Sequence, residues 1–226
     1  MEAGAVIGKA WAMYKAHWRH LLPIALVVYV LISLLSLLLV VLLGWFGAIL
    51  SALVALAGIF WLQGALVVAI DDVRDGRADL DIAQTLDRVL PRLNTLALAG
   101  VLAAIGITIG FILLIVPGLF LLTIWLLIVP VIVLEGCGVT DSFGRSRELV
   151  RGYGWSVFGV IVLTVLIILG VEIVTGLVQS ALDSRWASVL IDIITSAATA
   201  PFLALAWTLT YFELRRLKEA EPAASV

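Results

Sequence analysis

The sequence predicts an all-α membrane protein with six transmembrane helices, and three observations lead to that prediction. Of the 226 residues, 63% are hydrophobic and only 13% are charged, whereas about a quarter of a soluble domain is charged. Several apolar runs reach the roughly 20 residues that a helix needs to cross the hydrocarbon core. Basic residues flank these runs almost entirely on one predicted side of the membrane.

The first pair of spans follows an amphipathic helix predicted over residues 5–20. Aromatic and aliphatic residues recur there at helical spacing, which is typical of a helix in the headgroup layer: Ile7, Trp11, Tyr14 and Trp18. The first span is predicted over 21–43 and the second over 48–70. The sequence Gly44–Gly47 makes a short turn between them.

The second pair of spans follows a polar loop at Asp71–Asp79 and an amphipathic helix predicted over 80–93. Pro91 should bend that helix, because proline lacks the N–H group that a helix interior requires. Two further spans are predicted over 95–116 and 118–134, with Pro117–Gly118 as the turn between them.

The stretch from Pro117 to Gly152 combines a broken helix, an acidic residue and a basic helix, and the other units of the chain vary this arrangement. It contains a membrane-length helix that Pro130 should break. The acidic residue Glu135 follows at the membrane edge, and a basic helix is predicted over 140–151. The predicted N-cap of this basic helix is Thr140 or Asp141.

The third pair of spans is predicted over 153–178 and 187–212, with a short polar loop at 179–186. Residues 1–218 are predicted to form a single membrane domain. Residues 219–226 are charged at first and then small and polar, so we predict a disordered cytoplasmic tail.

The distribution of basic residues predicts the orientation of the chain. Cytoplasmic segments of membrane proteins carry an excess of lysine and arginine. Of the 14 such residues here, 13 lie before span one, between spans two and three, between spans four and five, or after span six. Only Arg185 falls on the other side. We therefore predict a multi-pass protein of the cell membrane, with both termini and the amphipathic helices on the cytoplasmic side.

The layout also indicates an internal repeat, with units at about 1–70, 71–138 and 139–218. Each unit has a basic amphipathic helix followed by a hairpin of two spans. The second span of each unit ends in an acid: Asp71, Glu135 and Glu213. Internal repeats are common in membrane folds. The alternative interpretation is that any three membrane hairpins would look alike.

Polar residues inside the predicted spans need an explanation, because charges are costly in a membrane. Glu172 and Asp192 fall within about two helical turns of the outer edge. One interpretation places them at the outer interface, where Arg185 could pair with one of them. The other is a proton or cation site between spans five and six. Gln63 is more typical of a bridge between helices.

Small residues predict which spans pack closely. Gly106 and Gly110 form a small-xxx-small motif, preceded by Ala99 and Ala103. The segment Ser196–Ala200 is similarly rich in small residues. We therefore expect the third and sixth spans to be central. The leucine-rich first span should face lipid.

The sequence has no pattern typical of a catalytic, metal or cofactor site. No nucleophile elbow, zinc-protease motif, phosphate-binding loop or dinucleotide motif occurs. Cys137 is the single cysteine, and His17 and His20 lack nearby carboxylates or thiols that would complete a metal site. The net charge of −2 argues against a nucleic-acid partner. We therefore expect no enzymatic activity and no cofactor.

Several segments together resemble a known membrane domain. They are Pro117–Gly118, Ile124–Gly136, Ser146, Leu149, Gly152, Trp155 and Tyr211–Glu219. This pattern is similar to the membrane domain found beside glycerophosphodiester phosphodiesterases and in related uncharacterised multi-pass proteins of bacteria and archaea. In those enzymes a separate catalytic barrel follows the membrane domain, whereas this chain ends soon after Glu219. The resemblance therefore implies the membrane module without the phosphodiesterase activity.

The leading functional hypothesis is a non-enzymatic membrane module that organises lipid or scaffolds a membrane or cytosolic protein partner, as a monomer or an oligomer. Basic helices at the membrane edge suit anionic headgroups. The candidate contact residues are Lys15, Trp18, Arg19, Arg88, Arg92, Arg145, Arg147, Arg151 and Trp155. The alternative hypothesis is a small transporter or channel subunit. It would use Gln63, Glu172 and Asp192 together with the proline breaks at Pro130 and Pro201.

Overall fold

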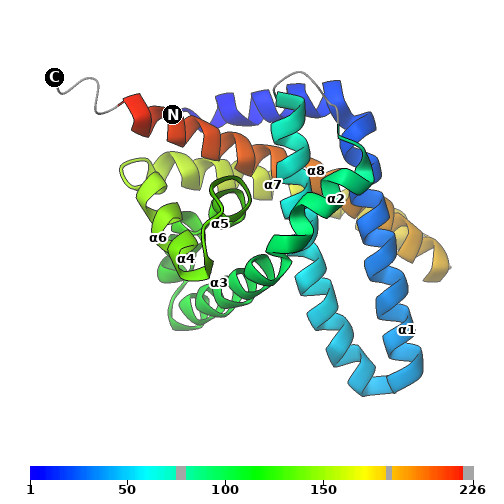
Figure 1. Ribbon diagram of the computed structural model, residues 1–226. Helices are drawn as coiled ribbons and strands as arrows, with labels where there is room; N and C mark the ends of the chain where they lie inside the picture. The colour runs from blue at the N-terminus through cyan, green and yellow to red at the C-terminus, as the bar shows by residue number, and fades with distance from the viewer. Residues whose placement is uncertain (75–79, 182–184, 221–226) are drawn as a thin grey trace.

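The computed structural model describes residues 1–74, 80–181 and 185–220, and every regular element in those residues is helical. Five helical stretches among them are long and apolar enough to cross a membrane. The longest, α1 (Ala3–Arg74), folds back on itself and so provides two arms of that length (Figure 1). The predicted all-α class is confirmed, and the helix lengths are those of a multi-pass membrane protein.

Helix α1 reverses its direction at Gly44, within the turn predicted at Gly44–Gly47. Gly44 has φ 58° and ψ −130°, a conformation that residues with a Cβ atom rarely adopt. Gly47 follows at a point where a Cβ atom would collide with the carbonyl oxygen of Leu39. The two arms of α1 therefore approach each other directly after the turn.

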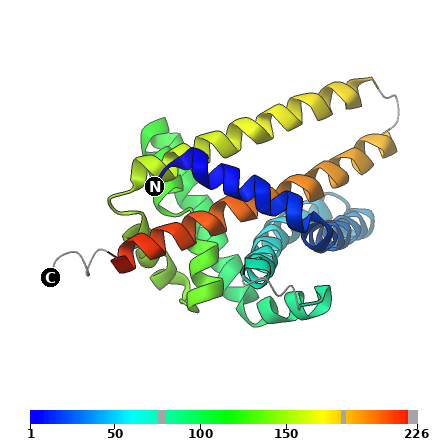
Figure 2. The same ribbon diagram turned by 90° about the horizontal axis from the view of Figure 1, so that it is seen from above.

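The amphipathic N-terminal part of α1 is continuous with the first arm. It lies at an angle to that arm (Figure 1), and α1 contains Pro23, a residue type that bends helices. This N-terminal part runs alongside α8 (Arg185–Ala220) (Figure 2). The hydroxyl of Tyr14 donates a hydrogen bond to the carbonyl oxygen of Ala198 over 2.9 Å. The amphipathic segment thus packs on another helix of the same chain.

The polar segment after the second arm of α1 starts later than predicted. The helix continues through Asp71 and Asp72 to Arg74, where the sequence predicted a loop. Asp72 accepts a hydrogen bond from the N–H of Leu80 over 3.1 Å, and Val73 is buried. These tertiary contacts support the extra helical turn despite its polar sequence. The rest of the predicted loop, 75–79, lies outside the described residues.

The second amphipathic helix is shorter than predicted and bends where expected. Helix α2 (Ile82–Val89) begins with a capping box built on Asp81. The 3₁₀ turn η1 (Leu90–Arg92) contains Pro91, and α3 (Leu93–Leu113) follows directly. The bend predicted at Pro91 is therefore confirmed.

The turn between α3 and α4 (Ile115–Ile124) lies at Leu114 and not at the predicted Pro117–Gly118. Leu114 is extended, with φ −166° and ψ 153°. Pro117 is the third residue of α4, where its missing N–H group removes no helical hydrogen bond. Gly118 serves packing, because a Cβ atom on Gly110 of α3 would lie 3.0 Å from its Cα atom. The glycine spacing in α3 therefore predicted a real contact between helices.

The helix after Leu114 is broken before it reaches its end. Residues 125–127 form a turn, α5 (Ile128–Pro130) is a single helical turn, and η2 (Val131–Glu135) is π-helical. Gly136 ends the segment in the left-handed region with φ 71°. The break predicted around Pro130 is confirmed.

The basic helix α6 (Val139–Val150) begins one residue earlier than predicted. Its N-cap is Gly138, and neither Thr140 nor Asp141 has that role, because both lie inside the first turn. Asp141 is still favourable there, since a negative charge suits the N-terminal end of the helix dipole.

The last pair of helices extends into segments that were predicted to be irregular. Helix α7 (Gly154–Ser180) and helix α8 occupy parts of the predicted loop at 179–186. Helix α8 also includes residues 219–220, so the predicted disordered tail at 219–226 is wrong for its first two residues. Residues 221–226 lie outside the described part of the chain.

The buried core lies where these helices meet. The small residues that predicted close packing of α3 and α8 are buried in it: Ala99, Ala103, Ala197 and Ala200. By contrast, the first arm of α1 exposes many large apolar side chains, including Leu37, Leu38, Val41 and Leu42. From this core the two arms of α1 and the α7–α8 pair extend in different directions (Figures 1 and 2).

Candidate functional site

Polar groups from three helical segments meet at the end of η2, in what we call the Glu135 cluster: Glu135, Arg145, Glu148, Tyr211 and Arg215. Arg145 donates from Nε to Glu135 over 2.8 Å and from Nη1 to Glu148 over 2.9 Å. The hydroxyl of Tyr211 donates to Glu135 over 2.8 Å and accepts a longer bond of 3.4 Å from Arg215. The cluster therefore connects η2, α6 and α8.

The central ion pair of the cluster is largely shielded from solvent. The side chain of Glu135 is 18% exposed and that of Arg145 is 35% exposed, while Tyr211 is fully buried. The hydrogen bond to Glu135 raises the pKa of Arg145 above its usual value. Burial raises the pKa of the nearby Cys137 thiol, and the negative charge of Glu135 adds to this. The charged side chains of the cluster are therefore paired with opposite charges: Arg145 with Glu135 and Glu148, and Arg215 with Glu219.

Ser146 of α6 fills the break between α4 and α5. Its hydroxyl donates to the carbonyl oxygen of Ile124 over 2.7 Å and accepts a hydrogen bond from the N–H of Leu127 over 3.2 Å. A break in an apolar helix leaves backbone groups without their partners, and each such group is costly when buried. Ser146 is itself fully buried, so one side chain satisfies both ends of the break.

These contacts were not anticipated from the sequence. Glu135 and Tyr211 are 76 residues apart, and hydrophobic periodicity predicts faces of helices, not partners between distant helices. Two sequence features could have pointed to this cluster. Glu135 is an acid directly after a broken apolar helix, and Tyr211 lies just before the basic end of the last span. A buried serine 16 residues after Pro130 gave no pattern at all.

The candidate contact residues on the first two amphipathic segments lie mostly on the surface. Lys15 lies 5.8 Å from the ring centroid of Trp11, and Arg19 lies 5.6 Å from that of Trp18. The side chains of these two cations and of Arg88 are exposed. Arg92 is half-buried and reaches toward Gly136: a Cβ atom there would lie 3.7 Å from its Nη2.

The candidates on α6 divide into two groups. Arg145 faces the Glu135 cluster. The side chains of Arg147 and Arg151 are exposed and have no hydrogen bond or ion pair within the described part of the chain. They border a hollow of about 580 Å³ between α4, α6 and the start of α7, which we call the lateral hollow. Trp155, in the first turn of α7, is 88% exposed.

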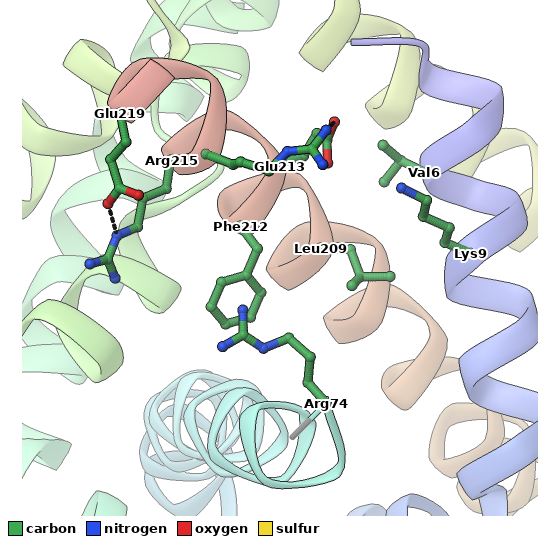
Figure 3. Close-up of a pocket in the computed structure, with 9 residues that line it drawn as sticks. Val6, Lys9, Arg74, Leu209, Phe212, Glu213, Arg215 and Glu219 are labelled. Atoms are coloured by element: carbon green, nitrogen blue, oxygen red, sulfur yellow. Dashed lines mark hydrogen bonds and ion pairs between the residues drawn. The ribbon is translucent and has the colours of Figure 1, made fainter. Parts of the chain in front are cut away.

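A second hollow of about 440 Å³ lies between both ends of α1 and the end of α8 (Figure 3). We call it the C-terminal hollow. Lys9 extends toward α8 from the N-terminal part of α1, and the guanidinium group of Arg74 lies 3.7 Å from the ring centroid of Phe212. The two arginines near the end of α8 are paired with acids: Arg215 with Glu219, and Arg216 with Glu213. The positive charge of the C-terminal hollow is therefore partly neutralised.

The polar residues proposed for transport lie in two different environments. Gln63 is buried in the second arm of α1. Glu172 and Asp192 are both exposed, and the amide of Gln179 donates a hydrogen bond from α7 to Asp192 on α8. The pairing suggested for Arg185 concerns a side chain outside the described part of the structure.

Among the described residues, no group of three or more histidine, cysteine or acidic side chains is placed to hold a metal ion. Comparisons with protein-family models, curated proteins and solved structures found no match to this chain.

Proposed function

We propose that this chain is a six-span protein of the cell membrane, built as three hairpins that each follow a cytosolic amphipathic helix. The observation that carries the topology is that 13 of the 14 lysines and arginines fall on one side of the proposed spans. In this arrangement the N-terminal part of α1, α2, α6 and the end of α8 lie in the cytoplasm. The three units 1–70, 71–138 and 139–218 are the proposed repeats.

The single native cysteine allows a direct test of the topology. Cys137 lies between η2 and α6, so a membrane-impermeant maleimide should label it in inside-out vesicles and not in intact cells. The matched control is Ser180→Cys in a Cys137→Ser background, because Ser180 ends α7 on the proposed outer side. It should show the reverse pattern. Labelling of Cys137 from outside would overturn the orientation.

We further propose that the protein is a non-enzymatic module that organises anionic lipid at its cytosolic face. The observation that carries this function is that exposed basic side chains lie over exposed tryptophan rings, Lys15 over Trp11 and Arg19 over Trp18. Within the described residues, the side chains of Arg147 and Arg151 are also exposed and have no acidic partner. Each basic residue near an anionic surface contributes about 1 kcal/mol.

Mass spectrometry of the molecules that copurify with the protein tests this function. We expect anionic phospholipid to be enriched over its fraction in the host membrane. A lipid composition equal to that of the bulk membrane, together with a stoichiometric protein partner, would favour the scaffold function instead. Size measurement of the same sample gives the oligomeric state.

A transport function is the second candidate, and the hydrogen bond from Gln179 to Asp192 is the observation that favours it. It places a carboxylate and an amide between two apolar helices, and Glu172 lies two helical turns earlier on α7. Ion flux in reconstituted vesicles that is lost in Glu172→Gln or Asp192→Asn would support transport. Absence of flux with protons, sodium and potassium would count against it.

A further inference from the structure

We propose that the lateral hollow binds one anionic phospholipid, with its phosphate between Arg147 and Arg151 and one acyl chain along α4. This inference rests on the proposed membrane function and names the ligand and its site. The hollow combines the two properties that such a ligand needs. At one end it has two arginines without acidic partners among the described residues, and at the other it has an apolar wall.

The two arginines are placed to bind the same phosphate. Arg147 lies in the last turn of α6, and Arg151 is the C-cap residue, whose N–H donates to the carbonyl oxygen of Arg147 over 3.0 Å. This bond keeps the helical spacing, in which residues four apart lie on one face with Cα atoms about 6 Å apart along the axis. Within the described residues neither has an acidic partner. Glu148 also borders the hollow, but its carboxylate is paired with Arg145 over 2.9 Å. The local charge is therefore positive, and guanidinium groups match phosphate oxygens in geometry.

The opposite wall of the hollow is apolar and faces outward. Phe120 of α4 is 58% exposed, and Ile124 one turn later also lines the hollow. Both belong to a helical stretch of membrane length. A ligand in this position would therefore contact hydrocarbon side chains at one end and guanidinium groups at the other. A phospholipid has this division, whereas a soluble phosphate or an acidic peptide would leave the apolar wall uncovered.

Glycines keep the hollow open between these two ends. Gly144, Gly152 and Gly154 all line it, and a Cβ atom on any of them would meet no atom within 4 Å. Gly152 has φ 90°, so the sharp connection from α6 to α7 itself requires a glycine. The resulting volume of about 580 Å³ is within the usual range for a ligand pocket.

Native mass spectrometry of the full chain released from nanodiscs tests this site. The nanodiscs contain phosphatidylcholine with a minor fraction of phosphatidylglycerol, and the readout is the number of phosphatidylglycerol molecules that stay bound. The wild type should retain one. The affinity of R147Q/R151Q for that lipid should fall about 25-fold, because each basic residue near an anionic surface contributes about fivefold.

Two control variants separate this site from general surface attraction. K9Q/R216Q removes the same number of exposed charges from the C-terminal hollow and should keep the bound lipid. Gly144→Leu should lose the lipid while both arginines remain, because its side chain enters the open hollow. This variant should fold, since Cβ has free space and leucine favours a helix over glycine.

The outcomes distinguish failure of the inference from failure of the proposed function. Equal retention by wild type and R147Q/R151Q would overturn the inference. Equal loss from both double variants would also overturn it, while leaving a general preference for anionic lipid intact. No preference for phosphatidylglycerol in the wild type would overturn the lipid function itself. Displacement of the lipid by millimolar inorganic phosphate would overturn the assignment to a lipid.

Discussion

Helix α6 carries arginines toward two regions with different charge balance. Arg145 faces the Glu135 cluster, where Glu135 and Glu148 accept its hydrogen bonds. Arg147 and Arg151 face the lateral hollow, where the described residues offer them no acidic partner. The sequence presents these residues as one basic helix, but the structure places them in two different environments.

A positive charge near a membrane is therefore not by itself a lipid contact. A half-buried charge is stable only when it is paired, because removing one partner leaves the other desolvated without compensation. An exposed charge stays hydrated, so it has no desolvation penalty and remains available to a ligand. Variants of the Glu135 cluster should therefore change stability, whereas variants of the lateral hollow should change binding.

The largest effect should come from Glu135→Ala. This change leaves the guanidinium group of Arg145 and the hydroxyl of Tyr211 without their shared acceptor, and we expect a loss of roughly 2–4 kcal/mol in the free energy of unfolding. Denaturant titration of the protein in detergent, followed by tryptophan fluorescence, measures it. The control is Glu148→Ala, because Glu148 binds the same arginine but is 67% exposed. It should cost less than about 1 kcal/mol. Equal costs would show that the pairing with Glu135 has no special role.

A smaller loss of about 1.5–3 kcal/mol is expected for Tyr211→Phe, which removes the hydrogen bond to the ionised carboxylate of Glu135 and the longer one from Arg215. The ring stays in its fully buried position, so packing is kept. Tyr29→Phe is the control, since the hydroxyl of Tyr29 has no hydrogen-bond partner within the described residues. In a double-mutant cycle, Tyr211→Phe should have little further effect once Glu135 is alanine. Full additivity would contradict the geometry.

Ser146→Ala should cost roughly 1–2 kcal/mol, because the N–H of Leu127 and the carbonyl of Ile124 lose their shared partner. The same unfolding titration measures this effect. Ser142→Ala is a close control on the same helix: Ser142 is equally buried, but its hydroxyl bonds only to the carbonyl of Val139. The Ser142 variant should be clearly more stable than the Ser146 variant. A reversed order would argue against the bridge across the break.

The local features of this fold were predictable from the sequence because each has a local cause. The turn at Gly44, the bend at Pro91 and the break around Pro130 follow from residues that cannot continue an ordinary helix. The contact between Gly110 and α4 follows from the absence of side chains on one helical face. Each of these needs information from only a few neighbouring residues.

Most features that the sequence did not predict correctly depend on contacts outside the local segment. The helical turn at Asp71–Arg74 is supported by tertiary contacts of Asp72 and Val73, which local polarity does not reveal. The sequence predicts a turn at Pro117, although proline is equally suited to the first turn of a helix. The separate roles of Arg145 and Arg147 depend on Tyr211 and Glu135 meeting across 76 residues. Composition and periodicity describe every basic residue of α6 in the same way.

The smallest effect on stability is expected for R147Q/R151Q. This double variant directly tests the difference between the Glu135 cluster and the lateral hollow. Both side chains are exposed and without acidic partners among the described residues, so the free energy of unfolding in lipid-free detergent should change by less than about 0.5 kcal/mol. Adding phosphatidylglycerol should stabilise the wild type, because a ligand that binds only the folded state shifts unfolding by mass action. The double variant should not gain this stabilisation, whereas Glu135→Ala should still gain it from a lower starting value. If R147Q/R151Q were as unstable without lipid as Glu135→Ala, the two sides of α6 would share one structural role and the division drawn between them would fail.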